Sequence, residues 1–464
     1  FTLDWPHDSS YYIFLLAFTA FMALQLRAIM LPLLRVPLPF KLGGRTVSAA
    51  AVIGIYIVLY LVFLWLSRKT RTKNEAYIYG FYMAAGVAGL AKGLVGALQP
   101  GMIVLLYLLT SREWRLLTDV ALTRGLLVAV CIFFPWYHGM LARFGRSFWN
   151  EFFGTEQFRR LTIGEQAQAK GTFEYYVSQV GYGLYPWIAF LPAAVVRAFS
   201  LPAEEPSPRD RARLFIFIWL AAGIAFFTLT ITKYHHYILP VIPPAAVVIA
   251  LYLDDLLEGK TRGVIFSLLA SFGVLAMVTF DLVKQPAHWV WMYTYLYDSN
   301  WAKGVPSGIP ILILGLVVGA GILMMLAPKI RRIGLVVAVM AGLLGGGVIQ
   351  NWYQLKVAPH WSQKKAIARY YKLRKNADEE LVAWQFNWRG ETWYTAADVV
   401  VSKSLDNKAI QAYLKERTGR KFFFITERSR YNSLCGMMPT EKGKTSCKIE
   451  DDTNIHYVLA SAEI

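Results

Sequence analysis

Residues 47–67 read VSAAAVIGIYIVLYLVFLWLS, a run without a charged residue. A helix needs about 20 apolar residues to cross the hydrocarbon core of a bilayer, so this run predicts a transmembrane helix. The basic segment 68–73 (RKTRTK) follows at once. Because basic loops stay on the cytoplasmic side of a membrane, we expect this end of the helix to be cytoplasmic.

The same pattern recurs along the chain. The other apolar runs cover residues 11–34, 76–91, 94–110, 121–141, 180–198, 213–232, 237–253, 263–283, 307–327 and 333–353. We therefore predict an all-α polytopic membrane domain over residues 1–354, with about eleven transmembrane helices. The runs 76–91 and 94–110 are separated by Lys92 and Gly93, so a re-entrant hairpin is the alternative to two spans.

The composition supports a membrane protein. Of the 464 residues, 56% are hydrophobic and 17% are charged, which is more apolar material than a soluble core of this length needs. The net charge of +18 does not indicate nucleic acid as a partner, because Lys and Arg gather in short loops between apolar runs.

Four basic loops set the expected orientation. Residues 68–73, 112–115, 209–213 and 329–332 fall on one side of the membrane if the spans alternate. The opposite, external side then receives the remaining polar segments, which are Lys92, the loop 142–179, the tetrad 233–236, the aromatic loop 284–306 and the C-terminal domain.

The pattern changes near residue 355, and residues 355–464 are expected to form a soluble α/β domain. Residues 381–386 and 421–426 (KFFFIT) are typical of buried strands, and a last strand is expected over 455–460. Residues 407–417 have a helical period. Asp406 is the expected N-cap of that helix.

Two of the three cysteines, Cys435 and Cys447, lie in this domain. They are separated by a segment rich in Gly and Pro that is able to turn, and an external location is oxidising. A disulfide between them is one of two outcomes that the sequence leaves open.

The longest polar segment within the apolar region begins at Pro135-Trp136-Tyr137 and contains FGRSFWNEFFGTEQFRRLT. It is amphipathic, so its phenylalanines, among them Phe158, could lie in the membrane interface. Its charged residues, Glu151, Glu156, Arg159 and Arg160, would then point to an aqueous cavity. An ordinary interfacial helix without a catalytic role is the alternative.

A second polar group, Lys233-Tyr234-His235-His236-Tyr237, is wedged between two apolar runs. Ionisable groups held this near a membrane are candidates for function. A lysine beside imidazoles and a phenol suits a phosphate group, because Lys carries the charge and the rings add directional hydrogen bonds. A lysine that extends its ammonium to the headgroups is the simpler alternative, and it applies equally to Lys92.

These stretches together resemble the C-type glycosyltransferases of the protein O-mannosyltransferase superfamily, most closely the bacterial branch that contains the lipid A aminoarabinose transferase. The matching segments, which cover roughly residues 76–253, are GLAKG at 89–93, PWY at 135–137, EQFRRL at 156–161, YPW at 185–187 and Lys233 with Tyr237-Ile238-Leu239-Pro240. The resemblance implies a membrane fold with the polar segments on the external face.

The resemblance also implies an activity: an inverting glycosyltransferase (a hexosyl- or pentosyltransferase) that moves a sugar from a polyprenyl-phosphate donor to a glycolipid such as lipid A, or to another periplasmic acceptor. The donor phosphate would contact Lys92, Arg159, Arg160, Lys233 and Tyr237. Glu156, His235 and His236 are additional site candidates. The protein would lie in the bacterial inner membrane with its C-terminal domain in the periplasm.

The chain departs from the family in two places. The family's catalytic aspartate lies in a first external loop that nothing here matches, and the chain begins with Phe1 rather than Met, so we expect that base to lie upstream. Asp4 and Asp8 are weak candidates for a second acidic residue. Gln157 replaces a histidine that is frequent in the family, so no metal ligands are assigned and no cofactor is expected to be required, although a divalent metal is compatible with the family.

Other functions fit parts of the pattern. A protein O-mannosyltransferase or an oligosaccharide ligase is the alternative within the enzyme class. A lipid flippase or transporter would share the apolar runs, but it should show paired repeats and charges deep in the bilayer, and the sequence shows neither. A structural scaffold is the remaining alternative.

Overall fold

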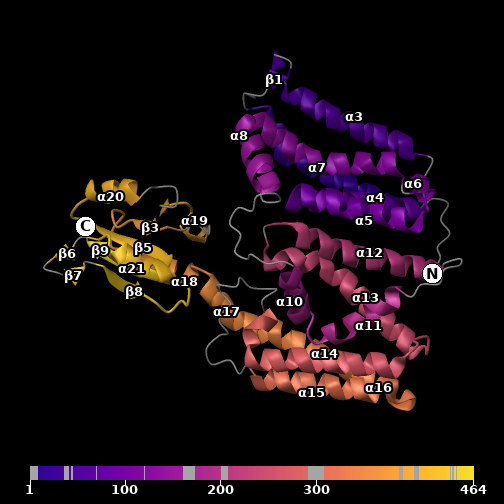
Figure 1. Cartoon of the computed structure of the whole chain (residues 1–464). Helices are drawn as coiled ribbons and strands as arrows, with labels where there is room; N and C mark the ends of the chain where they lie inside the picture. The colour runs from indigo at the N-terminus through magenta and orange to yellow at the C-terminus, as the bar shows by residue number, and fades with distance from the viewer. Residues whose placement is uncertain are drawn as a thin grey trace. The chain divides into compact units, whose positions relative to one another are not determined.

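A computed structural model of the chain describes residues 9–35, 41–42, 45–46, 48–68, 71–119, 121–159, 173–199, 207–231, 233–290, 308–385, 390–401, 407–438, 440–441, 444–445 and 447–463. The chain forms two compact units, Phe1–Val278 and Thr279–Ile464. The first unit is helical, apart from one short strand pair, and the second combines further helices with a sheet (Figure 1).

The first unit contains α1 (Ser9–Gln25), η1 (Leu26–Met30), α2 (Leu31–Leu33), β1 (Lys41–Leu42), β2 (Arg45–Thr46), α3 (Ala49–Ser67), α4 (Lys73–Lys92), α5 (Leu94–Ser111), α6 (Leu116–Asp119), α7 (Leu122–Phe144), α8 (Arg146–Phe148), η2 (Trp149–Arg159), α10 (Phe173–Gly183), η3 (Trp187–Phe190), α11 (Leu191–Phe199), α12 (Pro208–Leu229), η4 (His235–Val241) and α13 (Ile242–Leu257). Helix α14 (Val264–Lys284) begins in the first unit and ends in the second.

The second unit continues with η5 (Pro286–Val290), α15 (Gly308–Met324), η7 (Pro328–Ile330), α16 (Arg331–Val348), η8 (Ile349–Tyr353), α17 (Gln354–Trp361), α18 (Lys364–Leu373), β3 (Leu381–Ala383), α19 (Gly390–Tyr394), β4 (Val400–Val401), α20 (Asn407–Lys415), β5 (Lys421–Glu427), η9 (Arg428–Arg430), α21 (Tyr431–Cys435), β6 (Thr440–Glu441), β7 (Lys444–Thr445), β8 (Lys448–Asp451) and β9 (Tyr457–Glu463).

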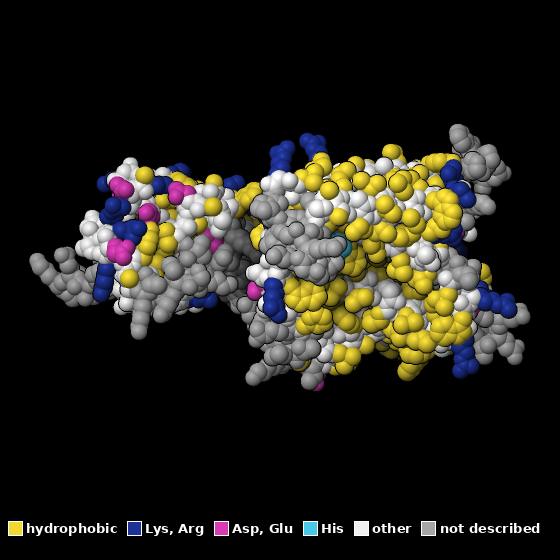
Figure 2. Space-filling model, turned by 90° about the horizontal axis from the view of Figure 1, so that it is seen from above, with side chains coloured by type: hydrophobic (Ala, Val, Ile, Leu, Met, Phe, Trp, Pro, Cys, Tyr) yellow, Lys and Arg dark blue, Asp and Glu magenta, His cyan; other side chains and the backbone are white. Residues whose placement is uncertain are grey.

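The predicted polytopic membrane protein is confirmed, but the number of eleven spans is not. Among the described residues, eight helices are long and apolar enough to cross a membrane, or nine if a bent pair counts as one span. Helix α15 has only 17 residues, and α4 starts with the polar residues Lys73, Asn74 and Glu75, which shortens its apolar part. Figure 2 shows hydrophobic side chains over the visible face of the helical part, with Lys and Arg gathered at its ends.

The bent pair replaces the straight span expected over residues 180–198. Helices Phe173–Gly183 and Trp187–Phe199 meet at an angle of 118°. The break contains Tyr185-Pro186, joined by a cis peptide bond. Proline donates no backbone hydrogen bond and disfavours the helical conformation in the residue before it, which explains why the helix ends here.

Small residues bring α4, α5 and α7 close together (Figure 1). A Cβ atom on Gly89 would lie 2.4 Å from the Phe133 ring of α7, and one on Gly96 would lie 2.2 Å from the carbonyl oxygen of Ala88. Larger side chains would therefore push the helices apart. Gly93 separates α4 from α5 with φ +70°, a conformation that favours glycine, so Lys92 stands at the tip of a helical hairpin.

The C-terminal domain is α/β, as predicted. Its five-stranded sheet has the order β4-β3-β5-β9-β8, with parallel β4-β3-β5 and antiparallel β9 and β8. The side chains of strand β5 alternate between the two faces of the sheet. Phe423 packs with Tyr370 of α18, whereas Phe422 and Phe424 pack with Ile410 of α20. Because successive residues of a strand point to opposite faces, the run KFFFIT fills the core on both sides. The expected N-cap Asp406 lies outside the described residues.

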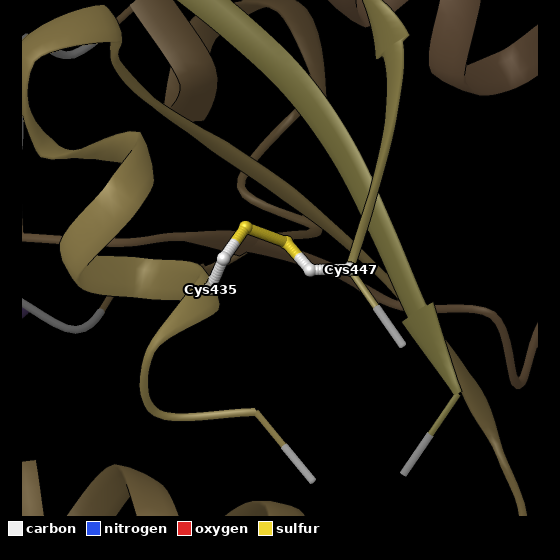
Figure 3. The surroundings of a disulfide bond; sticks show 2 residues. All are labelled: Cys435 and Cys447. Atoms are coloured by element: carbon white, nitrogen blue, oxygen red, sulfur yellow. A yellow bond between two sulfur atoms is a disulfide. The ribbon is translucent and has the colours of Figure 1, made fainter. Parts of the chain in front are cut away.

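Cys435 and Cys447 form a disulfide (Figure 3). Their Cα atoms are 5.5 Å apart, within the range that a disulfide spans. The bond joins the end of α21 to the residue before β8, so it ties a helix to the edge of the sheet. The sequence left open whether the two cysteines are bonded or free, and in the structure they are bonded.

Candidate functional site

The first unit has two polar ends, and contacts between helices assign residues to each. At one end, Arg124 of α7 lies 2.8 Å from Glu75 of α4. Here too Arg211 at the start of α12 lies 3.2 Å from Glu113, which follows α5. We call this the ion-pair end. Each of these helices has its other terminus at the opposite end, which we call the Lys92 end.

Lys92 lies in the last turn of α4 and is exposed. Its ammonium nitrogen lies 4.9 Å from the centroid of the Tyr237 ring in η4. A cation over an aromatic face at this distance is attracted by the negative face of the ring. Two of the five residues predicted to contact a phosphate thus meet, although they are far apart in sequence.

The tetrad Lys233–His236 leads into a 3-10 helix, η4. The ring centroids of Tyr234 and Tyr237 are 5.1 Å apart, and those of His236 and Tyr237 are 4.9 Å apart. His235 is buried, at 5% exposure, whereas His236 is half-buried. The rings of this segment therefore form one wall beside the Lys92 ammonium.

Lys233 is held in a different way. Its side chain is only 4% exposed, and its ammonium donates to the carbonyl oxygens of Thr228 at 2.8 Å and Thr230 at 2.7 Å. The last carbonyls of a helix have no partner within the helix, so Lys233 caps the end of α12. Burial lowers the pKa of Lys233. This side chain stabilises the segment that carries Tyr237.

Tyr176 of α10 completes this wall, and the sequence pattern did not single it out. It is 1% exposed, its hydroxyl donates to the carbonyl oxygen of Tyr234 at 3.4 Å, and its ring centroid lies 5.6 Å from the Lys233 ammonium. A tyrosine in an aromatic-rich loop gives no signal of such a contact, because only the fold brings α10 against η4.

The aromatic loop packs against α7 rather than lying free in the interface. The ring centroid of Phe152 lies 5.4 Å from that of Tyr137, and Phe153 lies 5.9 Å from it. The Tyr137 hydroxyl donates to the carbonyl oxygen of Gly89 at 3.0 Å. Phe158 is exposed, as the interfacial alternative expects. The cluster fixes η2 next to the turn that carries Lys92.

Several predicted site residues have no described side-chain placement. The side chains of Glu156 and Arg159 are not described, and Arg160 lies outside the described residues, as do Asp4 and Asp8. The convergence of the arginine pair with Lys92 therefore stays a prediction. Within the described part of the chain, no group of three or more His, Cys, Asp or Glu is placed to hold a metal ion.

Polar side chains inside the spans are further candidates that sequence analysis missed. Gln25 of α1 is 4% exposed and donates to the carbonyl oxygens of Cys131 at 3.2 Å and Ile132 at 3.1 Å. It lines a cavity of about 260 Å³ together with Leu90 and Trp136. The sequence feature that could have identified Gln25 is a single polar residue within an apolar run, because polar groups in a membrane are often functional.

Among the described residues, two carboxylates at the Lys92 end could act as a base. Glu151 belongs to η2, which packs against Tyr137, and Glu174 lies in the first turn of α10, shortly before Tyr176. Both are exposed. Glu151 is one of the charges that the sequence led us to expect at an aqueous cavity, whereas Glu174 was not singled out. Both become candidates because of the elements on which they lie.

The chain has the fold of the ArnT crystal structures, and it is a multi-pass membrane protein. It is similar to crystal structures of ArnT from Cupriavidus metallidurans. The structure bound to undecaprenyl phosphate matches 96% of this chain and 83% of that one, with a TM-score of 0.60 and 19% identity. The structure in the apo state gives a TM-score of 0.58 and 17% identity.

Curated relatives give the same result, although no protein-family model matches the chain. An undecaprenyl phosphate-alpha-4-amino-4-deoxy-L-arabinose arabinosyl transferase of Pseudomonas fluorescens is 31% identical over 52% of this chain and 45% of its own length. That of an Enterobacter species is 26% identical over 57% and 52%. The chain thus spans about half the length of these relatives. The resemblance predicted from the sequence is confirmed.

Proposed function

We propose that this protein is an inverting membrane glycosyltransferase that moves a sugar from a polyprenyl-phosphate donor to a lipid A-like glycolipid. The observation that carries the proposal is the meeting of Lys92 with Tyr237 at the tip of the α4–α5 hairpin. It occurs on a fold whose solved relative is described as bound to undecaprenyl phosphate. The relatives named as aminoarabinose transferases support a pentose as the sugar.

In the proposed reaction, an acceptor oxygen attacks the anomeric carbon of the donor sugar from the face opposite the phosphate. A carboxylate takes the acceptor's proton, and the bond between the anomeric carbon and the phosphate oxygen breaks with its electron pair on the phosphate. Lys92 stabilises the phosphate as it leaves, because a charge-assisted contact is stronger in a partly dry site than in water. Tyr237 holds the ammonium in place.

The predicted arginines Arg159 and Arg160 would extend this phosphate site, and Glu156, Glu151 or Glu174 would supply a carboxylate near it. The apolar cavity beside Leu90 and Trp136 offers room for part of an isoprenoid chain. Buried Lys233 contributes by fixing the tetrad.

The proposed orientation places the Lys92 end, together with the soluble domain 355–464, in the periplasm, and the ion-pair end in the cytoplasm of a bacterium. The positive-inside rule supports it, since the basic segments of the first unit gather at the ion-pair end. The disulfide in the soluble domain supports it as well, because disulfides persist in oxidising compartments. Alkaline phosphatase fused after Ile464 should be active in cells.

The function is tested with the purified full-length protein in vesicles that contain polyprenyl-phosphate aminoarabinose and lipid A. We expect sugar to appear on lipid A, with release of polyprenyl phosphate and an inverted anomeric configuration. Transfer to a protein acceptor instead would favour the O-mannosyltransferase alternative. Movement of the donor between leaflets without transfer would favour a flippase and overturn the proposal.

A further inference from the structure

A cavity of about 650 Å³ lies at the ion-pair end, among α11, α13 and α14. This volume falls within the range of ligand pockets in proteins. None of the residues assigned to the glycosyltransferase site lines it. Tyr252 of α13 lines the cavity, whereas Tyr237 lies fifteen positions earlier in the same span, so roughly 20 Å of helix separates the two sites.

One side of the cavity is basic. Arg197, Lys260 and Arg262 line it, and no Asp or Glu of the described part of the chain does. Arg197 already lies 2.9 Å from Asp255, and Lys260 lies 2.6 Å from Glu258. Arg262 is exposed and makes no ion pair with the residues that the structure describes. Its charge is therefore available to an anion that enters the cavity.

Thr261 gives a second, independent indication of a ligand. It lines the cavity and is only 9% exposed. Its hydroxyl oxygen is buried and has no hydrogen-bond partner among the described residues. A buried hydroxyl without a partner costs free energy, so such groups in native structures usually meet a ligand or water. A phosphate oxygen beside Arg262 would satisfy it.

The other side of the cavity is apolar and faces the membrane. Val196 of α11 and Phe266 of α14 line it, and they are 69% and 80% exposed. Ala193 and Ala270 leave room between the two helices. In a transmembrane helix such exposed apolar side chains contact acyl chains. An occupant must therefore combine an anionic head with an apolar tail.

We propose that this cavity binds an anionic phospholipid of the leaflet at the ion-pair end. Its phosphate lies against Arg262, Thr261 and Lys260, and one acyl chain lies between Val196 and Phe266. Basic pockets between transmembrane helices are known sites for such headgroups, and cytoplasmic leaflets supply anionic lipids. The site is separate from the donor site and does not depend on the proposed catalytic function.

The test is native mass spectrometry of the full-length protein in detergent, titrated with dioleoyl-phosphatidylglycerol or dioleoyl-phosphatidylcholine. We expect one phosphatidylglycerol to bind at least about tenfold more tightly than phosphatidylcholine. Both lipids carry the phosphate, but only phosphatidylcholine brings an ammonium group, which the basic residues Lys260 and Arg262 repel. Arg262→Ala should remove this preference. Lys73→Ala, which deletes an exposed charge at the same end but outside the cavity, should leave it unchanged.

Two further experiments identify the ligand. Ala270→Trp adds bulk at an exposed, uncharged position and should weaken phosphatidylglycerol binding without changing the charge. Glycerol phosphate should not compete at the same concentration, since it lacks the acyl chains. The proposal would be overturned if the two lipids bound equally or if Arg262→Ala kept the preference for phosphatidylglycerol. It would also be overturned if glycerol phosphate alone competed, or if polyprenyl phosphate displaced the lipid at equal concentration.

Discussion

At the ion-pair end of the helical unit, a buried carboxylate is paired with arginines. The carboxylate of Asp255 is almost fully buried, and three arginines surround it: Arg213 at 2.8 Å, Arg197 at 2.9 Å and Arg209 at 3.2 Å. At the Lys92 end, the lysines contact aromatic faces and backbone carbonyls instead. Lys92 lies over Tyr237, and Lys233 donates to the end of α12.

Charged side chains therefore have two roles in this helical unit, which are to hold helices together and, in the proposed function, to bind an anion. Paired charges at the ion-pair end cancel each other and fix α11, α12 and α13 together. A cation on an aromatic face keeps its charge, and the exposed position of Lys92 leaves it accessible to an anion. We therefore expect substitutions in the Asp255 cluster to change stability and substitutions of Lys92 to change activity.

The largest effect is expected for Asp255→Asn. Removing one partner of a buried ion pair leaves uncompensated charge, which costs about 3 to 5 kcal/mol. Thermal unfolding in detergent measures the loss. Asp254→Asn is the matched control, since Asp254 is half-exposed and Arg209 is its ion-pair partner among the described residues. This substitution should cost less than about 1 kcal/mol. Equal melting temperatures for both variants would contradict the structural role of Asp255.

Lys92→Met should lower the rate of sugar transfer about ten- to a hundredfold, since a charge-assisted contact to phosphate contributes about 1.5 to 3 kcal/mol. The melting temperature should stay within about 1 °C of the wild type, because Lys92 is exposed. Initial rates at limiting donor measure the effect. Lys73→Met, at the other end of α4, is the control and should keep the wild-type rate.

Lys233→Met should act through the fold, in contrast to Lys92→Met. It leaves two carbonyl oxygens at the end of α12 without their donor, at a cost of about 1 to 3 kcal/mol. The melting temperature should fall, and transfer should fall with it. A variant with wild-type stability and no transfer would show that Lys233 contacts the phosphate itself, as the sequence pattern suggested.

The sequence predicted those features that local pattern determines. Apolar runs located the membrane helices, and the continuous apolar run in KFFFIT predicted a buried strand, as β5 is. The lysine-glycine pair marked the turn after α4. Contacts across the fold were not accessible, because no local pattern brings Tyr176 to Tyr234 or Arg197 to Asp255. The same limit hid the burial of Lys233, whose charge alone suggested a binding role.

The smallest effect concerns the ring beneath Lys92. Tyr237→Leu removes the aromatic face, and an exposed cation–π contact contributes about 0.5 to 1 kcal/mol, so transfer should fall about two- to fivefold. Tyr237→Phe keeps the face and deletes one neutral hydroxyl, so it should lose less than the leucine variant. In the background of Lys92→Met, both changes should have little further effect, because the cation that the ring holds is gone.

Initial rates for the wild type, the three single variants and the two double variants form the required cycles. If Tyr237→Phe lost as much activity as Tyr237→Leu, the hydroxyl would be the group that acts, and the contact would lie with the substrate. If the losses at Lys92 and Tyr237 were additive, the two residues would act independently. Lys92 and Tyr237 would then be separate groups rather than a coupled pair.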